Sequence, residues 1–267
     1  MDDLQITFIQ SQLYWQNIEA NLAMLEEKLW QNIEATDLII LPEMFNTGFT
    51  MQAQRLAEPM NSRTFRWMKQ QAAQHNAVVT GSYIVREGMA YYNRLIWMEP
   101  DGNYAIYDKR HLFRMAQEDK YYNPGKKRLI RKLKGWKICP LVCYDLRFPV
   151  WSRNLVPEGE EDLPYHILLY VANWPAARIQ AWDVLLQARA IENLSYCIGV
   201  NRTGTDGQGI VYNGHSAVVN PKGQYLARLE DEEEIVNVKL SSSELMGFRE
   251  RFPAHLDSDS FKLQIDD

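Results

Sequence analysis

The chain has 267 residues, of which 46% are hydrophobic and 24% are charged, with a formal net charge of −5. This size and hydrophobic content suffice for one α/β domain with a large core, and they exclude a disordered chain. The acidic balance, with no basic run longer than residues 125–128, argues against a nucleic-acid partner. No apolar run has the length needed to cross a bilayer.

The cysteine content and the first residues indicate the compartment. Three cysteines form an odd number with no framework spacing, which argues against disulfides and against a zinc site. The segment Met1–Leu4 is acidic, whereas a signal peptide begins with basic residues. We therefore expect a cytoplasmic protein with no metal ion, no other cofactor and no membrane partner.

The first third of the chain alternates strands with helices. Residues 4–10 have the alternation of a strand, and residues 38–41 form the continuous apolar run of a strand buried on both faces. Between them a helix is predicted, because apolar residues recur at a spacing of three and four: Ile18, Leu22, Leu25, Leu29 and Ile33. A second helix over residues 62–74 and a strand over residues 77–85 follow.

The pattern then changes to a hairpin. Residues 91–98 and 104–111 are predicted as two strands joined by the turn Pro100–Gly102. The polar residues 113–128 predict a rim loop, a kind of segment that often carries function. The apolar residues 137–143 form the next strand.

The second half repeats the alternation of strands and helices. Strands are expected at residues 167–172, 196–200, 217–219, 225–227 and 235–238, a helix at 182–193, and a long loop at 201–213. Residues 241–267 are expected to form a C-terminal tail, with no regular element from Phe248 to the end. Because there is neither an internal repeat nor a linker, residues 1–267 are predicted as one layered α/β domain with a mixed sheet or two packed sheets.

The apolar run from Ile138 to Val142 ends in a cysteine and changes at once to polar residues and Pro149. This pattern predicts a buried strand that turns sharply into a helix. Such a turn projects the Cys143 side chain at the carboxyl end of the sheet and directs the following backbone N–H groups toward whatever it attacks. A cysteine in this position is also commonly a small buried hydrophobe. The stretch alone leaves both interpretations open.

Three polar residues follow apolar strands in equivalent positions: Glu43, Lys109 and Cys143. Sites in open α/β sheets form beyond the carboxyl ends of the strands, so convergence of these residues would make a coherent site. Cysteine supplies a nucleophile, glutamate transfers its proton, and lysine stabilises an oxyanion. This set suits acyl transfer from an amide or a nitrile. Each residue alone also has an ordinary explanation, as a solvated loop glutamate, a surface lysine or a buried thiol.

Three motifs resemble the signature blocks of the nitrilase superfamily of carbon–nitrogen hydrolases. They occur in the family's order, with Lys109 lying 66 residues after Glu43 and 34 residues before Cys143. The motifs are LPEMF at residues 41–45, YDKRHLF at 107–113 and VCYDLRFP at 142–149. Tyr92-Asn93, the turn at 100–102, ANWP at 172–175 and ARAIEN at 188–193 agree as well, so the resemblance covers residues 4 to about 240.

The resemblance implies a four-layer α-β-β-α sandwich that pairs into a homodimer. It also implies a catalytic triad: Glu43, Lys109 and Cys143. The oxyanion would lie between the lysine ammonium and the backbone N–H of Tyr144. A second glutamate, which orients the lysine and the substrate in this family, matches Glu118, and Asp119 is the competing choice. Val150 stands where many relatives have a glutamate, so no role is transferred from that position.

Within the superfamily, residues 42–49, residues 111–113 and the short length resemble the omega-amidase branch, which deamidates 2-oxoglutaramate and 2-oxosuccinamate. This branch implies a small-molecule amide substrate and release of ammonia through a cysteine thioester. An acidic substrate needs a cation opposite its carboxylate, and Arg147 and Arg178 are the candidates. Arg147 is equally suited to be a structural partner for carboxylates beneath the turn. Five aromatic residues are expected to wall the pocket: Phe45, Phe49, Tyr92, Phe113 and Trp174.

Three alternatives stay open. Another amidase of the superfamily would hydrolyse N-carbamoyl amino acids or the amide of deaminated glutathione. A Cys-His hydrolase would need an imidazole near Cys143, and only His111 and His215 lie near candidate rim segments. A non-catalytic binding scaffold would be expected to lack one of the catalytic residue types, and none is missing.

Overall fold

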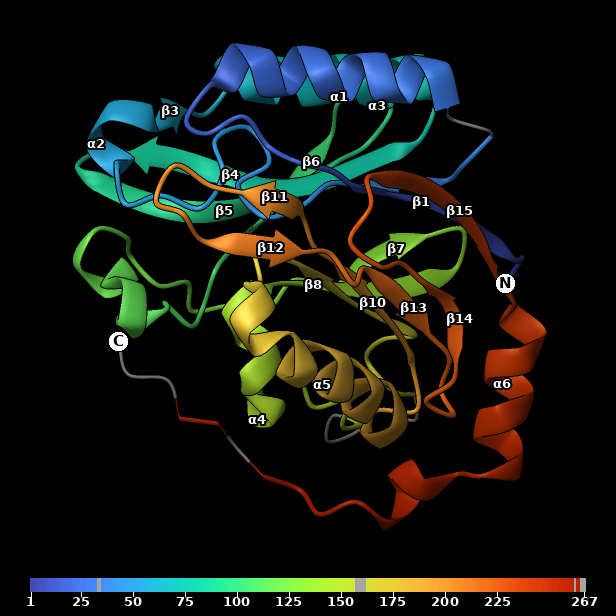
Figure 1. The fold of residues 1–267 in the computed structure, drawn as a ribbon. Coiled ribbons are helices and arrows are strands. Elements are labelled where there is room, and N and C mark those ends of the chain that lie inside the picture. The colour runs from blue at the N-terminus through green and yellow to red at the C-terminus, as the bar shows by residue number, and fades with distance from the viewer. Residues whose placement is uncertain (33–34, 157–161, 262, 265–267) are drawn as a thin grey trace.

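Two β-sheets lie face to face, and helices cover the outer face of each sheet (Figure 1). The computed structural model describes residues 1–32, 35–156, 162–261 and 263–264. The arrangement confirms the predicted α/β class and the α-β-β-α order of layers. Ile33, which was expected on the first helix, lies outside the described residues.

The first sheet has the strand order β15-β1-β2-β4-β5-β6, with the short β3 paired to β4. Strands β1, β2 and β4 are parallel, whereas β15, β5 and β6 are antiparallel to their neighbours. The strands are β1 (Leu4–Gln10), β2 (Leu38–Ile40), β3 (Glu58–Pro59), β4 (Val78–Glu87), β5 (Ala90–Met98), β6 (Tyr104–Asp108) and β15 (Glu234–Leu240).

The second sheet has the order β14-β13-β10-β9-β8-β7, and its three central strands β8, β9 and β10 are parallel. A separate hairpin of β11 and β12 lies inside the segment that was expected to be a loop. The strands are β7 (Arg131–Leu133), β8 (Trp136–Val142), β9 (Ile167–Val171), β10 (Tyr196–Val200), β11 (Thr203–Thr205), β12 (Val211–Asn213), β13 (Ala217–Val219) and β14 (Tyr225–Arg228).

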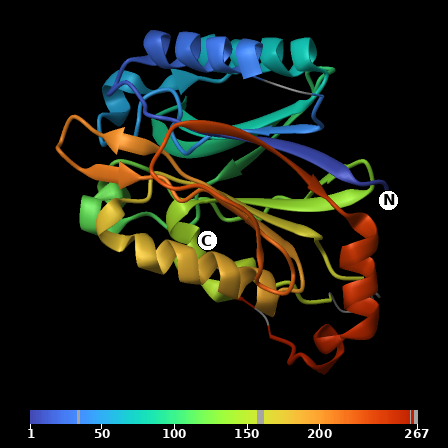
Figure 2. The ribbon, with the colours of Figure 1, turned by 45° about the vertical axis from the view of Figure 1, so that its right-hand side comes forward.

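The helices form the two outer layers. Helices α1 (Ile18–Asn32) and α3 (Arg63–His75) cover the first sheet, and α5 (Ile179–Glu192) covers the second (Figure 1). The view in Figure 2 shows α6 (Ser242–Arg251) alongside the second sheet. Two further helices have one turn each, α2 (Ala53–Leu56) and α4 (Pro149–Ser152). No described helix combines the length and the apolar character needed to span a membrane.

Side chains of one strand in the first sheet pack in two separate cores, one on each face of the sheet. Leu95 and Trp97 of β5 belong to the core that includes the second sheet, whereas Ile96 and Met98 pack beneath α1 and α3. The division follows from the strand geometry, because successive side chains point to opposite faces. Whether a residue occupies an odd or an even position along the strand therefore decides whether it faces the space between the sheets or the outer helices.

The C-terminal segment departs from its prediction. Residues 242–251 form helix α6, so the expectation of an irregular chain is wrong for residues 248–251. The Ser241 hydroxyl accepts the Glu244 N–H and caps the helix start. The buried Arg249 guanidinium donates to the carbonyl oxygens of Leu194 and Tyr165, both at 2.8 Å. A charged residue that anchors a helix leaves no signal in the hydrophobic pattern.

Gly199 of β10 permits the close approach of α5 to the second sheet. A Cβ atom there would lie 2.5 Å from a Leu186 methyl carbon and 2.6 Å from the Trp182 ring.

We predict that Gly199→Ala destabilises the fold by about 1–3 kcal/mol, because the added methyl group forces helix α5 to shift. Urea unfolding checks this value. Met89→Ala, at a side chain that is 99% exposed, should stay within about 0.5 kcal/mol of the parent. Equal stability of all three proteins would contradict the close packing.

Candidate active site

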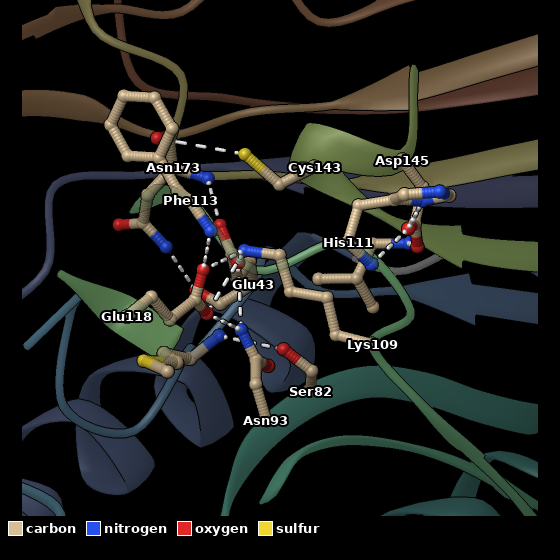
Figure 3. Close-up of polar contacts among 12 residues, drawn as sticks. Glu43, Ser82, Asn93, Lys109, His111, Phe113, Glu118, Cys143, Asp145 and Asn173 are labelled. Atoms are coloured by element: carbon tan, nitrogen blue, oxygen red, sulfur yellow. Dashed lines mark hydrogen bonds and ion pairs between the residues drawn. The ribbon is translucent and has the colours of Figure 1, made fainter. Parts of the chain in front are cut away.

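The candidate site lies between the two sheets, at the carboxyl ends of parallel strands (Figure 3). Glu43 follows β2 of the first sheet, and Cys143 follows β8 of the second. Lys109 comes directly after β6, and Asn173 lies two residues beyond β9. Strand ends from both sheets therefore meet at one place, as expected for the ends of apolar strands.

Lys109 lies between two buried carboxylates. Its Nζ is 2.8 Å from Glu43 Oε1, and 3.1 and 2.9 Å from the two carboxylate oxygens of Glu118. The Lys109 side chain is 1% exposed and both glutamates are fully buried. Burial lowers the pKa of Lys109, but the charges of Glu118 and Glu43 outweigh it and hold this pKa above its usual value. The ammonium ion is therefore the stable form in the folded protein.

The second carboxylate is fixed by the loop that carries it. Glu118 Oε2 accepts the backbone N–H of Phe113 at 2.6 Å, in addition to the Lys109 contacts. Burial raises the pKa of the Glu118 carboxyl, an effect that Lys109 opposes and Glu43 reinforces. Asp119, the competing choice, pairs instead with the largely exposed Arg114. The structure thus brings Glu118, and not Asp119, to Lys109.

The Glu43 carboxylate is held from both sheets. Asn93 of β5 donates its side-chain N–H to Oε1, and the backbone N–H of Asn173 donates to Oε2, each at 2.8 Å. The Asn173 side-chain amide also donates to the Glu43 carbonyl oxygen. The next residue, Met44, has a φ of 42°, and its N–H is bound by the Ser82 hydroxyl at 3.0 Å. These contacts leave the carboxylate little rotational freedom.

Cys143 sits at the predicted sharp turn. Its φ is 44°, in the left-handed region that a non-glycine residue enters only when its surroundings impose it. The thiol is 8% exposed and lies 3.9 Å from the carbonyl oxygen of Asn173. Burial raises the pKa of the Cys143 thiol, the Glu43 carboxylate raises it further, and Lys109 only partly offsets these effects. The resting thiol is therefore protonated at neutral pH.

A buried carboxylate holds the turn in place. Asp145 Oδ2 accepts the Val142 N–H at 3.0 Å and the Tyr107 hydroxyl at 2.7 Å. Its Oδ1 accepts the backbone N–H of His111 and lies 2.7 Å from His111 Nδ1. Because Tyr107 lies on β6, two residues before Lys109, this network ties the cysteine turn of one sheet to the lysine strand of the other.

The histidines do not support a Cys-His pair. His111 is turned to Asp145, and its ring stacks on Phe148 with centroids 3.7 Å apart. His215 Nδ1 lies 2.9 Å from Asp183. Among the described residues, the ionisable side chains that act on the Cys143 thiol are Glu43, Lys109 and Glu118. The imidazole that this alternative requires is absent from that set.

Several predicted pocket residues do border the site. The Lys109 ammonium lies 5.2 Å from the Phe49 ring centroid. The Phe113 ring packs edge-on against the Tyr144 ring, with centroids 5.0 Å apart. The Arg178 guanidinium lies over the face of the Phe113 ring. The buried Trp174 follows Asn173, and the Arg147 guanidinium lies 4.9 Å from its ring centroid. No carboxylate of the described chain pairs with Arg147, so of its two open roles the structure does not support that of a structural partner for carboxylates.

Two predicted pocket residues do not line the site. The Phe45 ring is fully buried and packs against Trp67 and Tyr83 in the core beneath the outer helices. Tyr92 neighbours Asn93 on β5, so its side chain points to the opposite face of the sheet, where the Arg94 guanidinium lies over its ring. Both predictions failed because the motif gives the segment and not the direction in which each side chain points.

The sequence alone assigned no role to Asn93, Asn173, Ser82 or Asp145, although all four hold the candidate site residues or the turns that carry them. A signal existed for Asn173, which follows an apolar strand in the same way as Cys143 and Glu43 do. Asn93 could have been found from the predicted hairpin, because it lies on the strand that pairs with the strand ending before Lys109. In the structure the Asn93 carbonyl oxygen accepts the Lys109 N–H at 3.0 Å. The described residues contain no group of histidine, cysteine, aspartate and glutamate side chains that would hold a metal ion.

The model of a known family, described as carbon-nitrogen hydrolase, matches residues 5–249. The chain belongs to the carbon–nitrogen hydrolase family. This membership confirms the resemblance carried by the three motifs, and the chemistry of the family is hydrolysis of carbon–nitrogen bonds, as in amides.

The similarity to named relatives covers nearly the whole chain. Omega-amidase YafV of Escherichia coli strain K12 is 44% identical over 264 residues, which are 98% of this chain and 100% of that protein. A 2-oxoglutaramate amidase of Bacillus subtilis strain 168 is 31% identical over 93% of this chain and 95% of its own. The crystal structure of XC1258 from Xanthomonas campestris, a CN-hydrolase superfamily protein with an arsenic adduct in its active site, has a TM-score of 0.97. It is 44% identical and covers 99% of this chain and 100% of its own.

The raised pKa of Cys143 predicts slow alkylation at neutral pH. In wild-type protein, the rate of iodoacetamide labelling at Cys143 should rise with pH and show no plateau below about pH 9, because only the thiolate reacts. Peptide mass spectrometry measures this rate. The variant Cys143→Ala gives the background from the fully buried Cys139 and Cys197. A titration midpoint of labelling near pH 7 or lower would contradict a protonated resting thiol.

Proposed function

We propose that the protein hydrolyses the terminal amide of a small carboxylic acid, of the 2-oxoglutaramate or 2-oxosuccinamate type, to the acid and ammonia. The observation that carries the proposal is the buried Glu43–Lys109–Glu118 group beside the Cys143 thiol. The full-length similarity to an omega-amidase and to a 2-oxoglutaramate amidase supports this substrate class.

In the first step the Cys143 sulfur attacks the amide carbonyl carbon. Glu43 accepts the thiol proton as the carbon–sulfur bond forms, and the carbonyl electron pair moves onto oxygen. A base is needed, because burial keeps the thiol protonated. The Lys109 ammonium and the backbone N–H of Tyr144 stabilise the oxyanion. One donor of this kind contributes about 3–4 kcal/mol in comparable sites.

Collapse of the tetrahedral intermediate breaks the carbon–nitrogen bond. Glu43 returns its proton to the leaving nitrogen, so ammonia departs and a thioester remains on Cys143. Water then attacks the thioester while Glu43 takes a proton from it. The second collapse releases the acid, and the sulfur regains its proton from Glu43. One carboxylate thus serves both half-reactions, which agrees with its rigid placement by Asn93 and Asn173.

The alternatives receive less support. An amidase for N-carbamoyl amino acids or for deaminated glutathione would use the same triad, but the similar proteins named above are amidases of other amides. A non-catalytic scaffold does not account for a site that keeps every residue type that amide chemistry needs. Phe49, Phe113 and Trp174 are proposed as the pocket wall of the hydrolase.

We also propose that the protein is a cytoplasmic homodimer. The three cysteines are free, which suits a reducing compartment. Val184 and Ile191 of α5 are 56% and 51% exposed and lie seven residues apart on the helix, and Met246 of α6 is 48% exposed. Exposed apolar side chains on these two helices suit contact with a second copy of the chain.

The triad assignment predicts the effect of three substitutions. Cys143→Ser and Glu43→Gln should each lower kcat for ammonia release by at least about 10³-fold, because one removes the thiol nucleophile and the other the base. His111→Ala, tested beside them, should retain far more activity. Ammonia release from 2-oxoglutaramate provides the assay. Near-normal turnover by Cys143→Ser, or complete loss only in the histidine variant, would overturn the triad.

The two neighbouring acidic residues should respond differently. Glu118→Gln removes one of the two charges that hold the pKa of Lys109 high, so this pKa falls and the alkaline limb of the pH–rate profile moves to lower pH. We expect kcat to drop by about 10- to 100-fold at neutral pH. Asp119→Asn, which changes only a surface pair with Arg114, should remain within about twofold of wild type. Equal effects of both substitutions would argue against the role of Glu118.

A further inference from the structure

Arg147 differs from the other arginines that the fold covers. Seven buried or half-buried arginines donate from their guanidinium to an oxygen of the described chain: Arg94, Arg110, Arg131, Arg153, Arg189, Arg202 and Arg249. Among the described residues, the hydrogen-bond partner of the Arg178 guanidinium is the sulfur of Met115, at 3.9 Å. The Arg147 guanidinium has no hydrogen bond or ion pair with any described residue, and it lies over the face of the Trp174 ring.

The position of this unpaired cation follows from the chain on both sides of it. Arg147 ends the short helical turn that begins at Cys143. Trp174, on which it lies, is one residue beyond Asn173, whose carbonyl oxygen is 3.9 Å from the Cys143 sulfur and whose N–H binds Glu43. Trp174 therefore links the Arg147 guanidinium to the residue that contacts both the thiol and Glu43, so the guanidinium borders the site.

The charges of the site create a need for this cation. Two acidic side chains, Glu43 and Glu118, face one ammonium, Lys109, so the group beside the thiol has no surplus positive charge for a substrate anion. The charge of such an anion has to be met by a second cation. The buried indole of Trp174 covers one face of the Arg147 guanidinium and reduces its hydration, while its N–H edge remains available for two parallel bonds to a carboxylate.

We propose that Arg147, held flat on Trp174, binds the free carboxylate of the substrate and makes the enzyme selective for monoamides of dicarboxylic acids over neutral amides. The proposal rests on the proposed amidase function. It assigns the carboxylate to Arg147 and not to Arg178, whose guanidinium lies over Phe113 and contacts the exposed Met115. Arg147 is thus a binding residue that contacts the end of the substrate remote from the reacting carbon.

The test compares two substrates of similar length, the monoamide of glutaric acid and the neutral butyramide. Arg147→Gln should raise KM for the anionic amide by about 10- to 100-fold and leave kcat/KM for butyramide within about threefold of wild type. Arg147→Lys should restore part of the loss, because it returns the charge without the bidentate geometry. Arg66→Gln, which removes an exposed charge on α3, should change neither substrate.

Two outcomes would overturn the assignment. An equal loss for both amides in Arg147→Gln would show that Arg147 supports the Cys143 turn and does not read the carboxylate. A selective loss in Arg178→Gln with none in Arg147→Gln would place the carboxylate on the other arginine.

A binding measurement separates this proposal from the amidase function. Calorimetry with glutarate should show binding to wild-type protein that weakens by about 10- to 100-fold in Arg147→Gln. If wild-type protein turned over neither amide yet kept this Arg147-dependent binding, the proposed function would fail and the carboxylate site would stand. Equal affinity of glutarate for both proteins would contradict the site itself.

Discussion

The structure depends on one buried group of charges, the Lys109 ammonium between the carboxylates of Glu43 and Glu118. Removing three ions from water costs several kcal/mol each, and only close pairing with further hydrogen bonds offsets this cost. Three neighbouring polar groups donate to the carboxylates: the side chain of Asn93 and the backbone N–H groups of Asn173 and Phe113. In the proposed mechanism, the same contacts hold Glu43 beside the thiol and the Lys109 ammonium beside the developing oxyanion.

The two-sheet architecture explains how such a site is assembled. Strands of both sheets end at the same place, so the first sheet places Glu43 and Lys109 there and the second places Cys143. The layers α1/α3 and α5 cover the outer faces of the two sheets (Figure 1). The Asp145 network joins the two halves, since it holds the Cys143 turn through Val142 and the lysine strand through Tyr107. A change in the packing of the sheets would therefore alter the distance between the Cys143 thiol and the Glu43 carboxylate.

The sequence predicted most of the fold, and the strand-end residues that the structure brings together, for a physical reason. Continuous apolar strands followed by Glu43, Lys109 and Cys143 indicate both burial and position at a strand end, and the motifs supply their order. The misplaced residues were those whose direction depends on parity or long-range contacts. Phe45 and Tyr92 lie in the right segments on the wrong faces, and α6 is anchored by Arg249 through carbonyl groups that are 55 and 84 residues away. No local pattern encodes such contacts.

The most direct test of the account is detection of the acyl group on Cys143 during turnover. Rapid acid quench of the enzyme with a 2-oxo acid amide, followed by peptide mass spectrometry, should show the added mass of the acyl group on the peptide that contains Cys143. The adduct should form within the first turnover and decay as substrate is exhausted. Ammonia release with no adduct on Cys143, or with the adduct on another residue, would contradict the proposed mechanism.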